Sequence, residues 1–363
     1  MKSPCDLTTE QGLSSLLSAT QSGHISVKLL SGGTANYVYR CTKQDGSTSI
    51  FKHAAPYLHS NKSFAFDPTR MDYEAEILTQ LASKNKPFFA DPPNTTVHAV
   101  QLLSYNKNNK LLEIEDSGTR NLKDAYTDPD LNPSQISQHL ATWLAALHTS
   151  STNTSLTLEG QDSNARNNPI GVTIYRHSYR NLHLALEQFG HDTQLAHRIN
   201  ENFGSLLATD DECVCHGDFW PGNVLVRSNE AQSASLTVVD WEMVRRGTSA
   251  TDVGQFAAEA FLLDRFRGGR GLLAAFLRAY VAERKDGEVL GKMWLRRMVV
   301  HWGVHVAFWP TCVEWTDVAG TQKLVDIGVG VLESILQDDW EKTLESPLLE
   351  DVRDVFALIL ERV

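Results

Sequence analysis

The chain has 363 residues, of which 42% are hydrophobic and 21% charged, and its formal net charge is −11. This composition is ordinary for a globular protein and leaves room for two lobes. The negative charge and the lack of a Lys/Arg-rich run argue against nucleic acid or an anionic membrane surface as the main partner. A small-molecule partner is therefore expected.

The cysteines and apolar segments bear on the compartment. The five cysteines show no paired CxxC spacing, which predicts neither a disulfide framework nor a zinc site and fits reduced thiols in the cytoplasm. The polar first twenty residues do not resemble a secretory signal. The apolar segment Met298 to Trp309 is short and interrupted by His301 and His305, which argues against a membrane span.

The first predicted strand, Val27 to Leu30, runs into a glycine-containing loop, and Tyr37 to Cys41 alternates as the returning strand. Glycines without a Cβ let backbone N–H groups approach phosphate oxygens closely. A plain hairpin turn is the alternative for this loop. Its candidate nucleotide contacts are Gly32, Gly33 and Asn36.

The next strand, Ser49 to His53, places Lys52 among apolar neighbours, where its cation could reach the phosphates of ATP. An exposed strand lysine is the ordinary alternative. A helix predicted from Arg70 to Leu81 offers Glu74 and Glu76 as partners for the lysine. Only one of them can face it, because residues two apart on a helix point to different sides.

Two further strands, Ala99 to Tyr105 and Lys110 to Glu115, are predicted to form a hairpin, and the strand pattern ends near residue 116. Five strands and one helix predict a small nucleotide-binding lobe over residues 1–116. The backbone of its final segment, Glu113 through Glu115 to Asp116, is the predicted hinge that could hydrogen-bond adenine.

The remaining residues, 117–363, are predicted to form a mostly helical lobe. Asn132 as N-cap and Pro133 at the first helical position begin a helix that ends near His148. Residues 150–168 are polar and predict a loop near the cleft. The later helices are expected within 180–207 and at 251–263, 270–284, 289–308, 320–337 and 347–361.

The most informative stretch is HGDFWPGN, residues 216–223, which is followed by an apolar strand. A second apolar strand leads into the sequence VDWE, residues 239–242. A hairpin of these strands would bring Asn223 and Asp240 side by side. An ordinary turn is the alternative for the HGD segment, since Gly, Asp and Asn are common turn residues.

These residue types are those that phosphoryl transfer needs, because a carboxylate can orient the attacking hydroxyl while Asn and Asp oxygens hold Mg²⁺ on ATP. We assign Asp218 as the base and Asn223 and Asp240 as metal ligands. Glu242 either binds the metal as well or hydrogen-bonds the residues that bind it. His216 is interpreted as a scaffold whose ring hydrogen-bonds the loop backbone.

With these residues the chain resembles the aminoglycoside phosphotransferase and choline kinase superfamily of small-molecule kinases. The resemblance implies an α+β, protein-kinase-like fold, with a small N-terminal antiparallel β lobe carrying one helix and a larger, mostly helical C-terminal lobe. It implies ATP and Mg²⁺ as cofactors and Asp218 as the catalytic base. It also implies Lys52 as the phosphate-binding lysine, with Glu74 as its partner.

Within the superfamily, several segments are most similar to 5-methylthioribose kinase. They are 52–57 with Arg70 and 74–76, 114–116, 252–254 and 295–298. That resemblance implies substrate contacts by Arg296 and Arg297, and we add Trp220 as a candidate. A solvated helix face is the alternative for the arginines. The FWPGN sequence and Trp241 depart from that family and are closer to fructosamine kinases and wider relatives.

Aromatic and histidine side chains are dense late in the chain. They are Trp294, His301, Trp302, His305, Trp309 and Trp315. The helical spacing of Trp302, Val306 and Trp309 predicts that a packed core explains most of them. Those that face the cleft could stack on a sugar ring or enclose a thioether.

The sequence therefore predicts an ATP- and Mg²⁺-dependent kinase of a hydroxyl on a small sugar-like metabolite. Aminoglycosides, fructosamines and choline-type alcohols are alternative acceptors. A non-catalytic relative that binds nucleotide or a metabolite is a second hypothesis, against which the full set Lys52, Asp218, Asn223 and Asp240 stands. Protein phosphorylation is disfavoured because no long activation segment follows the VDWE sequence.

Overall fold

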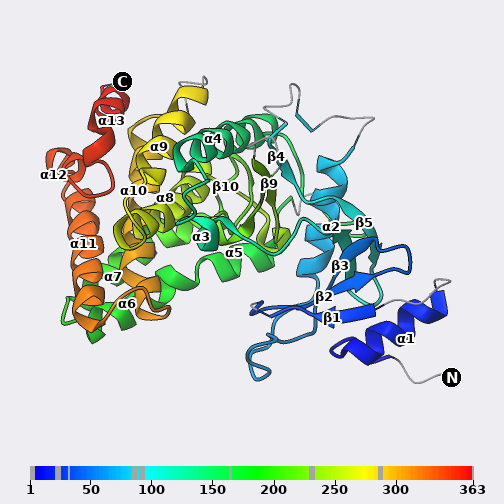
Figure 1. Ribbon diagram of the computed structural model, residues 1–363. Helices are drawn as coiled ribbons and strands as arrows, with labels where there is room; N and C mark the ends of the chain where they lie inside the picture. Colours follow the sequence, from blue (N-terminus) through cyan, green and yellow to red (C-terminus); the bar gives the residue numbers. More distant parts are fainter. Residues whose placement is uncertain are drawn as a thin grey trace.

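The computed structural model describes residues 5–20, 26–31, 33–83, 88–89, 95–162, 166–228, 234–284 and 289–361. The chain forms a smaller lobe around an antiparallel sheet and a larger lobe that is mostly helical (Figure 1). Helices α1 and α13 lie at opposite ends of the molecule. The predicted α+β class with two unequal lobes is confirmed.

The smaller lobe contains α1 (Glu10–Thr20), β1 (Ser26–Leu29), β2 (Tyr37–Thr42), β3 (Thr48–His53), α2 (Arg70–Leu81), β5 (Leu102–Asn106) and β6 (Leu111–Glu115). Its strands pair antiparallel in the order β1-β2-β3-β6-β5. The predicted helix over 70–81 is confirmed at both ends.

Helix α1 is a correction, because the sequence predicted only one helix in this lobe. Leu13 and Leu17 of α1 are buried in one cluster with Tyr39 and Phe51 of the sheet. Successive side chains of a strand point to opposite faces, so Phe51 faces α1 while Lys52 faces the other side. Covering one face of the sheet with α1 thus leaves the lysine directed towards the larger lobe.

Strand β4 (Val97–Ala99) is a second correction. It pairs in parallel with β9 (Ala234–Val238), in a three-stranded sheet of order β4-β9-β8. The predicted continuous strand over 99–105 is therefore broken, and its two parts lie in different sheets. This part of residues 1–116 joins the two lobes by backbone hydrogen bonds.

Strand β8 (Val224–Ser228) and β9 form the predicted antiparallel hairpin. Val224 lies opposite Val238, and the Val239 N–H donates to the Asn223 carbonyl over 3.0 Å. Because this register aligns the open end of the hairpin, Asn223 and Asp240 emerge next to each other, as expected from the sequence.

The larger lobe further contains α3 (Leu122–Ala125), α4 (Pro133–Ser150), α5 (Pro169–Tyr175), α6 (His177–Gln188), α7 (Thr193–Ile199), β7 (Cys213–Cys215), β10 (Arg245–Gly247), α8 (Ser249–Phe266), α9 (Leu272–Glu283), α10 (Lys292–Phe308), α11 (Val318–Leu336), α12 (Trp340–Leu344) and α13 (Arg353–Leu360). Single turns occur at η1 (Asn200–Gly204), η2 (Ser205–Ala208), η3 (Pro221–Asn223), η4 (Trp241–Met243), η5 (Trp309–Thr311) and η6 (Glu350–Val352). The single helix expected over 347–361 is thus replaced by η6 and α13.

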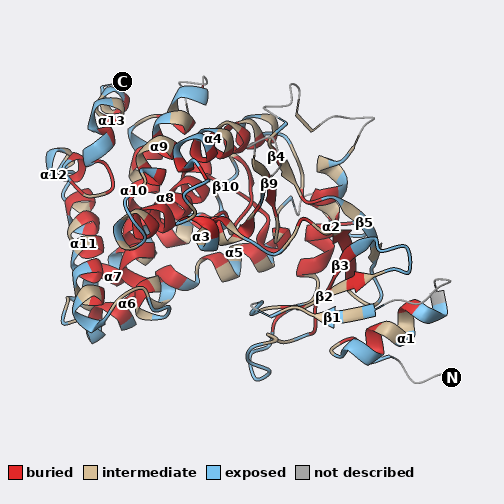
Figure 2. Ribbon diagram, in the orientation of Figure 1, coloured by how far each residue is buried: buried red, intermediate tan, exposed pale blue. Residues whose placement is uncertain are grey.

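Helices α8 and α10 lie in the interior of the larger lobe and pack against each other (Figure 2). The predicted N-cap of α4 is present, since the Asn132 side chain accepts a hydrogen bond from the Gln135 N–H. No helix in the described ranges combines the length and apolar character that crossing a membrane requires.

The polar loop predicted over 150–168 is tied to the body of the lobe where it is described. The Asn168 side chain caps α5 and donates to the Val244 carbonyl over 2.9 Å. The buried Arg246 guanidinium donates to the carbonyls of Ser151 and Thr152. Hydrogen bonds from side chains to backbone carbonyls, together with the buried Leu156 and Leu158, therefore anchor this segment.

Candidate active site

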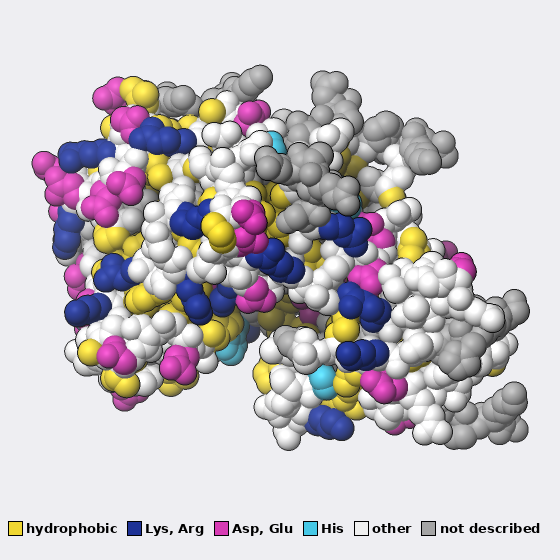
Figure 3. Space-filling model, in the orientation of Figure 1, with side chains coloured by type: hydrophobic (Ala, Val, Ile, Leu, Met, Phe, Trp, Pro, Cys, Tyr) yellow, Lys and Arg dark blue, Asp and Glu magenta, His cyan; other side chains and the backbone are white. Residues whose placement is uncertain are grey.

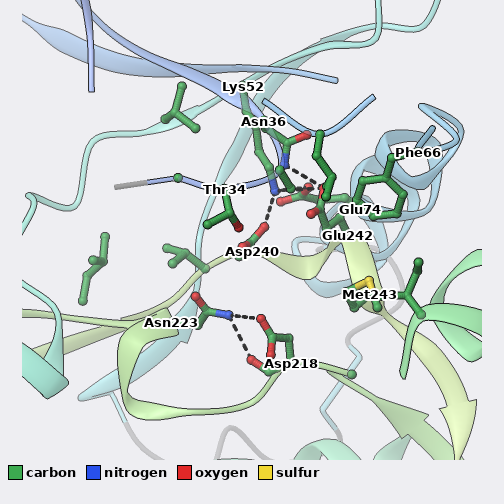
Figure 4. A pocket seen from close by; sticks show the side chains of 18 of the residues that line it. Thr34, Asn36, Lys52, Phe66, Glu74, Asp218, Asn223, Asp240, Glu242 and Met243 are labelled. Atoms are coloured by element: carbon green, nitrogen blue, oxygen red, sulfur yellow. Dashed lines mark hydrogen bonds and ion pairs between the residues drawn. The ribbon is translucent and has the colours of Figure 1, made fainter. Parts of the chain in front are cut away.

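A cavity of about 950 Å³ lies between the two lobes and is lined by residues of both. The space-filling view shows the hollow between them (Figure 3). Most of the residues assigned to catalysis from the sequence line this cavity, and a close view shows how they face one another (Figure 4).

Lys52 is buried and lines the cavity from β3 of the smaller lobe. Its Nζ lies 2.7 Å from Glu74 Oε2 and also contacts the Asp240 carboxylate. Glu76 instead accepts a hydrogen bond from Gln80. Of the two candidate glutamates, the structure therefore pairs Glu74 with the lysine. Burial opposes the charged lysine, but the surrounding carboxylates outweigh it and raise the pKa of Lys52 above its ordinary value.

Asp240 follows β9 in a left-handed backbone conformation, with φ 67° and ψ 61°. This conformation is uncommon for a residue other than glycine and is found at functional sites. Burial favours the protonated acid, but contact with Lys52 holds the pKa of Asp240 below its ordinary value. Asp240 thus keeps a charged carboxylate at the cavity, where its side chain is 38% exposed.

The loop that carries Asp218 is held by its own histidine and by Asp252 of α8. His216 Nε2 lies 3.0 Å from the Val239 carbonyl, and its Nδ1 accepts from the Asp218 N–H over 3.2 Å. This fits the scaffold role predicted for His216. Asp252 accepts the N–H groups of His216 and Gly217 over 2.7 and 3.1 Å.

Gly217 cannot be replaced easily in this loop. Its φ is +81°, and an added Cβ would lie 1.9 Å from the Met243 carbonyl oxygen. The glycine therefore lets the Asp218 loop pack directly against η4, which follows Asp240.

The Asp218 carboxylate is fixed by two side-chain amides. Asn223 Nδ2 donates to its Oδ2 over 2.8 Å, and Gln255 Nε2 donates to its Oδ1 over 2.7 Å. Burial, followed by the charge of Asp240, raises the pKa of Asp218 to about 7. Because Asn223 uses its amide nitrogen on Asp218, its oxygen has no hydrogen-bond partner in the described part of the chain and is free to bind a ligand.

Glu242 lies behind Lys52 and is tied by other groups. Its Oε2 accepts from Asn36 Nδ2 over 2.7 Å and from Arg70 Nε over 3.0 Å. Asn36 Oδ1 in turn accepts from Arg70 Nη2 over 2.9 Å. Glu74, Asp240 and Glu242 come close enough to surround a cation, and Lys52 itself occupies that role.

One end of the cavity has apolar walls suited to a flat ring. The lining side chains there are Leu30, Val38, Ile50, Ile114, Leu225 and Val239. Gly33, Asn36 and Glu115 also line the cavity, whereas Gly32 lies outside the described residues. The Glu113 side chain does not reach it, because it is buried in the sheet and accepts from Ser49 and Ser104.

The other end of the cavity is lined mainly by rings and histidines. Its lining side chains are Leu58, Phe64, Phe66, Ile174, Tyr175, His177, Ser178, Met243, Gln255, His301, His305 and Trp309. Of the late aromatic and histidine cluster singled out in the sequence, His301, His305 and Trp309 face the cavity, while Trp302 is buried in the core.

The three residues predicted to bind substrate are not brought to the cavity. Arg297 forms an ion pair with Asp210 and Arg296 with Asp338. Lys123 lies 5.1 Å from the centre of the Trp220 ring. None of the three is among the residues that line the cavity.

Several residues that shape the site had no assigned role in the sequence analysis. They are Gln255, Asp252, Tyr175 and Arg70. Arg70 and Asp252 lay in segments quoted for their family resemblance. Gln255 lies three residues after Asp252 on α8. Its contact with Asp218 could not be predicted, because the sequence does not show which face of this helix meets the Asp218 loop.

Comparison with known proteins gives a consistent result. Residues 26–290 match the profile of a family described as the phosphotransferase enzyme family. Over 367 aligned residues the chain is 26% identical to 4-hydroxytryptamine kinase of Psilocybe cyanescens, with 95% of this chain and 98% of the relative covered.

Solved structures share the two-lobed architecture. A putative fructosamine-3-kinase from Thermobifida fusca YX-ER1 superposes with a TM-score of 0.51 at 17% identity, covering 92% of this chain and 100% of that one. Amicoumacin kinase in complex with AMP-PNP, Ca²⁺ and Ami gives a TM-score of 0.50 at 14% identity, covering 91% and 94%. At these identities the likeness shows the fold, and it confirms the predicted kinase-like class.

Proposed function

Because the chain belongs to the phosphotransferase enzyme family and is a small-molecule kinase, we propose that it transfers the γ-phosphoryl group of ATP to a hydroxyl of a planar aromatic metabolite. The observation that carries the proposal is the Asp218 carboxylate, held by Asn223 and Gln255 across the cavity from Lys52 and Asp240. An acceptor hydroxyl and a terminal phosphate would meet between these groups.

Each residue has a specific part in the proposed reaction. Asp218 accepts the proton of the acceptor hydroxyl while that oxygen bonds to the γ-phosphorus and the bond to the ADP oxygen breaks. The pKa of Asp218, raised to about 7, suits a base that must both take up and release a proton near neutral pH. Lys52, positioned by Glu74, neutralises phosphate charge.

The residues present also fit a divalent cation such as Mg²⁺. The unpartnered amide oxygen of Asn223 and the charged, half-exposed Asp240 would hold it, since Mg²⁺ takes few carboxylates together with phosphate oxygens. The cation would neutralise charge on the transferred phosphoryl group. Glu242 is tied to Arg70 and Asn36, so we propose that it positions Lys52 and the glycine loop instead of binding metal.

The nucleotide is proposed to occupy the apolar end of the cavity. Val38 and Ile50 of the sheet and Leu225 of β8 would enclose the adenine ring, with the backbone near Glu115 at its edge. The phosphates would then pass Gly33 and Asn36, which also line the cavity. We therefore still propose that the backbone near Glu115 contacts adenine, although the Glu113 side chain is buried in the sheet.

A planar aromatic acceptor fits the other end better than the sugar-like one expected from the sequence. His177, Trp309 and Phe66 supply aromatic side chains there, and aromatic rings stack favourably on one another. The relative that acts on 4-hydroxytryptamine matches the chain over nearly its whole length. Arg296 and Arg297, the substrate contacts that the likeness to 5-methylthioribose kinase implied, form ion pairs elsewhere.

An acceptor panel with ATP and Mg²⁺ tests the proposal, with phosphorylated products identified by mass spectrometry. The panel contains 4-hydroxytryptamine, 4-hydroxyindole, 5-methylthioribose, a ketosamine, choline and an aminoglycoside. We expect phosphorylation of the two hydroxyindoles. Turnover of a non-aromatic acceptor alone would overturn the aromatic assignment. Thermal stabilisation by ATP without any transfer would favour the non-catalytic alternative.

A further inference from the structure

We propose that His305, backed by Glu259, binds a protonated amine on the acceptor at the end of the cavity beyond Asp218. The inference rests on the proposed function for the identity of the acceptor hydroxyl. It adds a second recognition point that selects hydroxylated aromatic amines over their neutral counterparts.

The position of the pair follows from the packing of α8 against α10. Gln255 contacts Asp218, and Glu259 lies four residues further along α8, about 6 Å or one helical turn away. His305 lies one turn beyond His301 on α10 and lines the cavity. A small ring with its hydroxyl at Asp218 could therefore bring a side-chain amine to His305.

Glu259 is a buried carboxylate that lacks a strong counter-charge. Only 8% of the residue is exposed, and its Oε1 lies 2.9 Å from His305 Nε2. Its Oε2 is buried without a hydrogen-bond partner, and the described residues give it no Lys or Arg. Burying a carboxylate is unfavourable unless positive charge or donors compensate, so this pair favours a cationic ligand.

His305 transmits this negative charge to the cavity. With Nε2–H donating to Glu259, the Nδ1 atom carries the lone pair, and it has no hydrogen-bond partner in the part of the chain that is described. An ammonium group can donate to that lone pair. A carboxylate that accepts from one imidazole nitrogen fixes the tautomer and the orientation of the ring.

Among the described residues, the neighbouring His301 does not supply a positive charge that would neutralise Glu259. His301 bonds Tyr175 through Nε2 over 2.9 Å and Tyr179 through Nδ1 over 3.1 Å. Since Tyr175 donates its hydroxyl hydrogen to the Thr251 carbonyl, it accepts from His301, which places a proton on Nε2 of that ring. Burial also lowers the pKa of His301 well below its ordinary value.

The carboxylates that line the cavity directly lie at its proposed reacting and nucleotide ends. They are Glu74, Glu115, Asp218, Asp240 and Glu242. Rings surround the amine position instead, since Trp309 lies 6.1 Å from His305 and 6.2 Å from His177 between ring centres. Aromatic faces attract cations and would add to the effect of the carboxylate.

The test compares equilibrium binding of 4-hydroxytryptamine and 4-hydroxyindole by calorimetry, because binding does not depend on turnover. We expect wild-type protein to prefer the amine at least tenfold and Glu259→Gln to lose that preference while binding 4-hydroxyindole unchanged. Glu333→Gln, which removes one exposed carboxylate of α11, is the matched control and should keep it. The double variant Glu259→Leu/His305→Leu leaves neither polar group unpaired and serves if Glu259→Gln does not fold.

Steady-state kinetics separate the inference from the proposed function. Loss of Glu259 should raise KM for the amine at least tenfold with little change in kcat. Equal effects on both ligands, or a wild-type protein without amine preference, would overturn the inference even if 4-hydroxyindole is phosphorylated. An amine preference that disappears in Glu259→Gln, without phosphorylation of any acceptor, would support the inference while refuting the proposed function.

Discussion

Gln255 Nε2 donates a hydrogen bond to Asp218 Oδ1 over 2.7 Å, although the two residues are 37 positions apart in the chain. We predict that Gln255→Leu lowers kcat by roughly tenfold or more, because a hydrogen bond to a charged group contributes about 1.5–3 kcal/mol. KM for ATP should not change. Gln138→Leu, on the exposed face of α4, is the control and should retain wild-type kcat.

Glu74 and Glu76 allow a matched comparison on one helix. Glu74→Gln should lower kcat/KM by about 10²-fold, since a displacement of about 1 Å in a positioning group has effects of that size. Glu76→Gln removes the same charge from a side chain that contacts Gln80 and should stay within about twofold of wild type. Similar losses in both variants would contradict the pairing of Lys52 with Glu74.

Arg296 and Arg297 test whether the late arginines bind substrate or stabilise the fold. Arg297 is 8% exposed and pairs with Asp210, so Arg297→Ala should lower the free energy of unfolding by about 3–5 kcal/mol. Arg296→Ala breaks a more exposed pair and should cost about 1 kcal/mol or less. Urea denaturation measures both. An acceptor KM raised more than tenfold in a folded variant would restore the substrate-binding prediction.

Thiol labelling of the native protein checks the packing of both lobes. Cys5 and Cys312 are exposed, whereas Cys41, Cys213 and Cys215 are buried. Burial raises the pKa of the Cys41 thiol to about 12 and that of Cys213 well above its ordinary value, which suppresses the reactive thiolate. Iodoacetamide should therefore modify two cysteines before unfolding and five after it. Early modification of Cys41 would contradict the packing of α1 on the sheet.

The positions of Lys52, Asn223 and Asp240 could be predicted from the sequence because these residues lie in or directly beside short strands. The alternation of β3 directed Lys52 inward, and the hairpin of β8 and β9 joined Asn223 to Asp240. Periodicity also located α2 to the residue. In each case the geometry depends on contacts close in the chain, which local patterns encode.

The features that could not be predicted from the sequence depend on packing between elements that are distant in the chain. Helix α1 lies within the polar first twenty residues and is stabilised by packing on the outer face of the sheet. β4 leaves the hairpin pattern because β9, far along the chain, offers it a parallel partner. Gln255, Glu259 and His305 are polar residues on otherwise buried helices, and only the α8–α10 contact shows which face meets the cavity.

The proposed role of Asp218 is that of the base in a kinase acting on a small aromatic hydroxyl. Its most direct test is the single-turnover rate of phosphoryl transfer from ATP to 4-hydroxytryptamine in wild-type protein and in Asp218→Asn. We predict a fall of about 10²–10⁴-fold in the variant, with the Kd for ATP unchanged within about twofold. Transfer at the wild-type rate in Asp218→Asn would contradict the account.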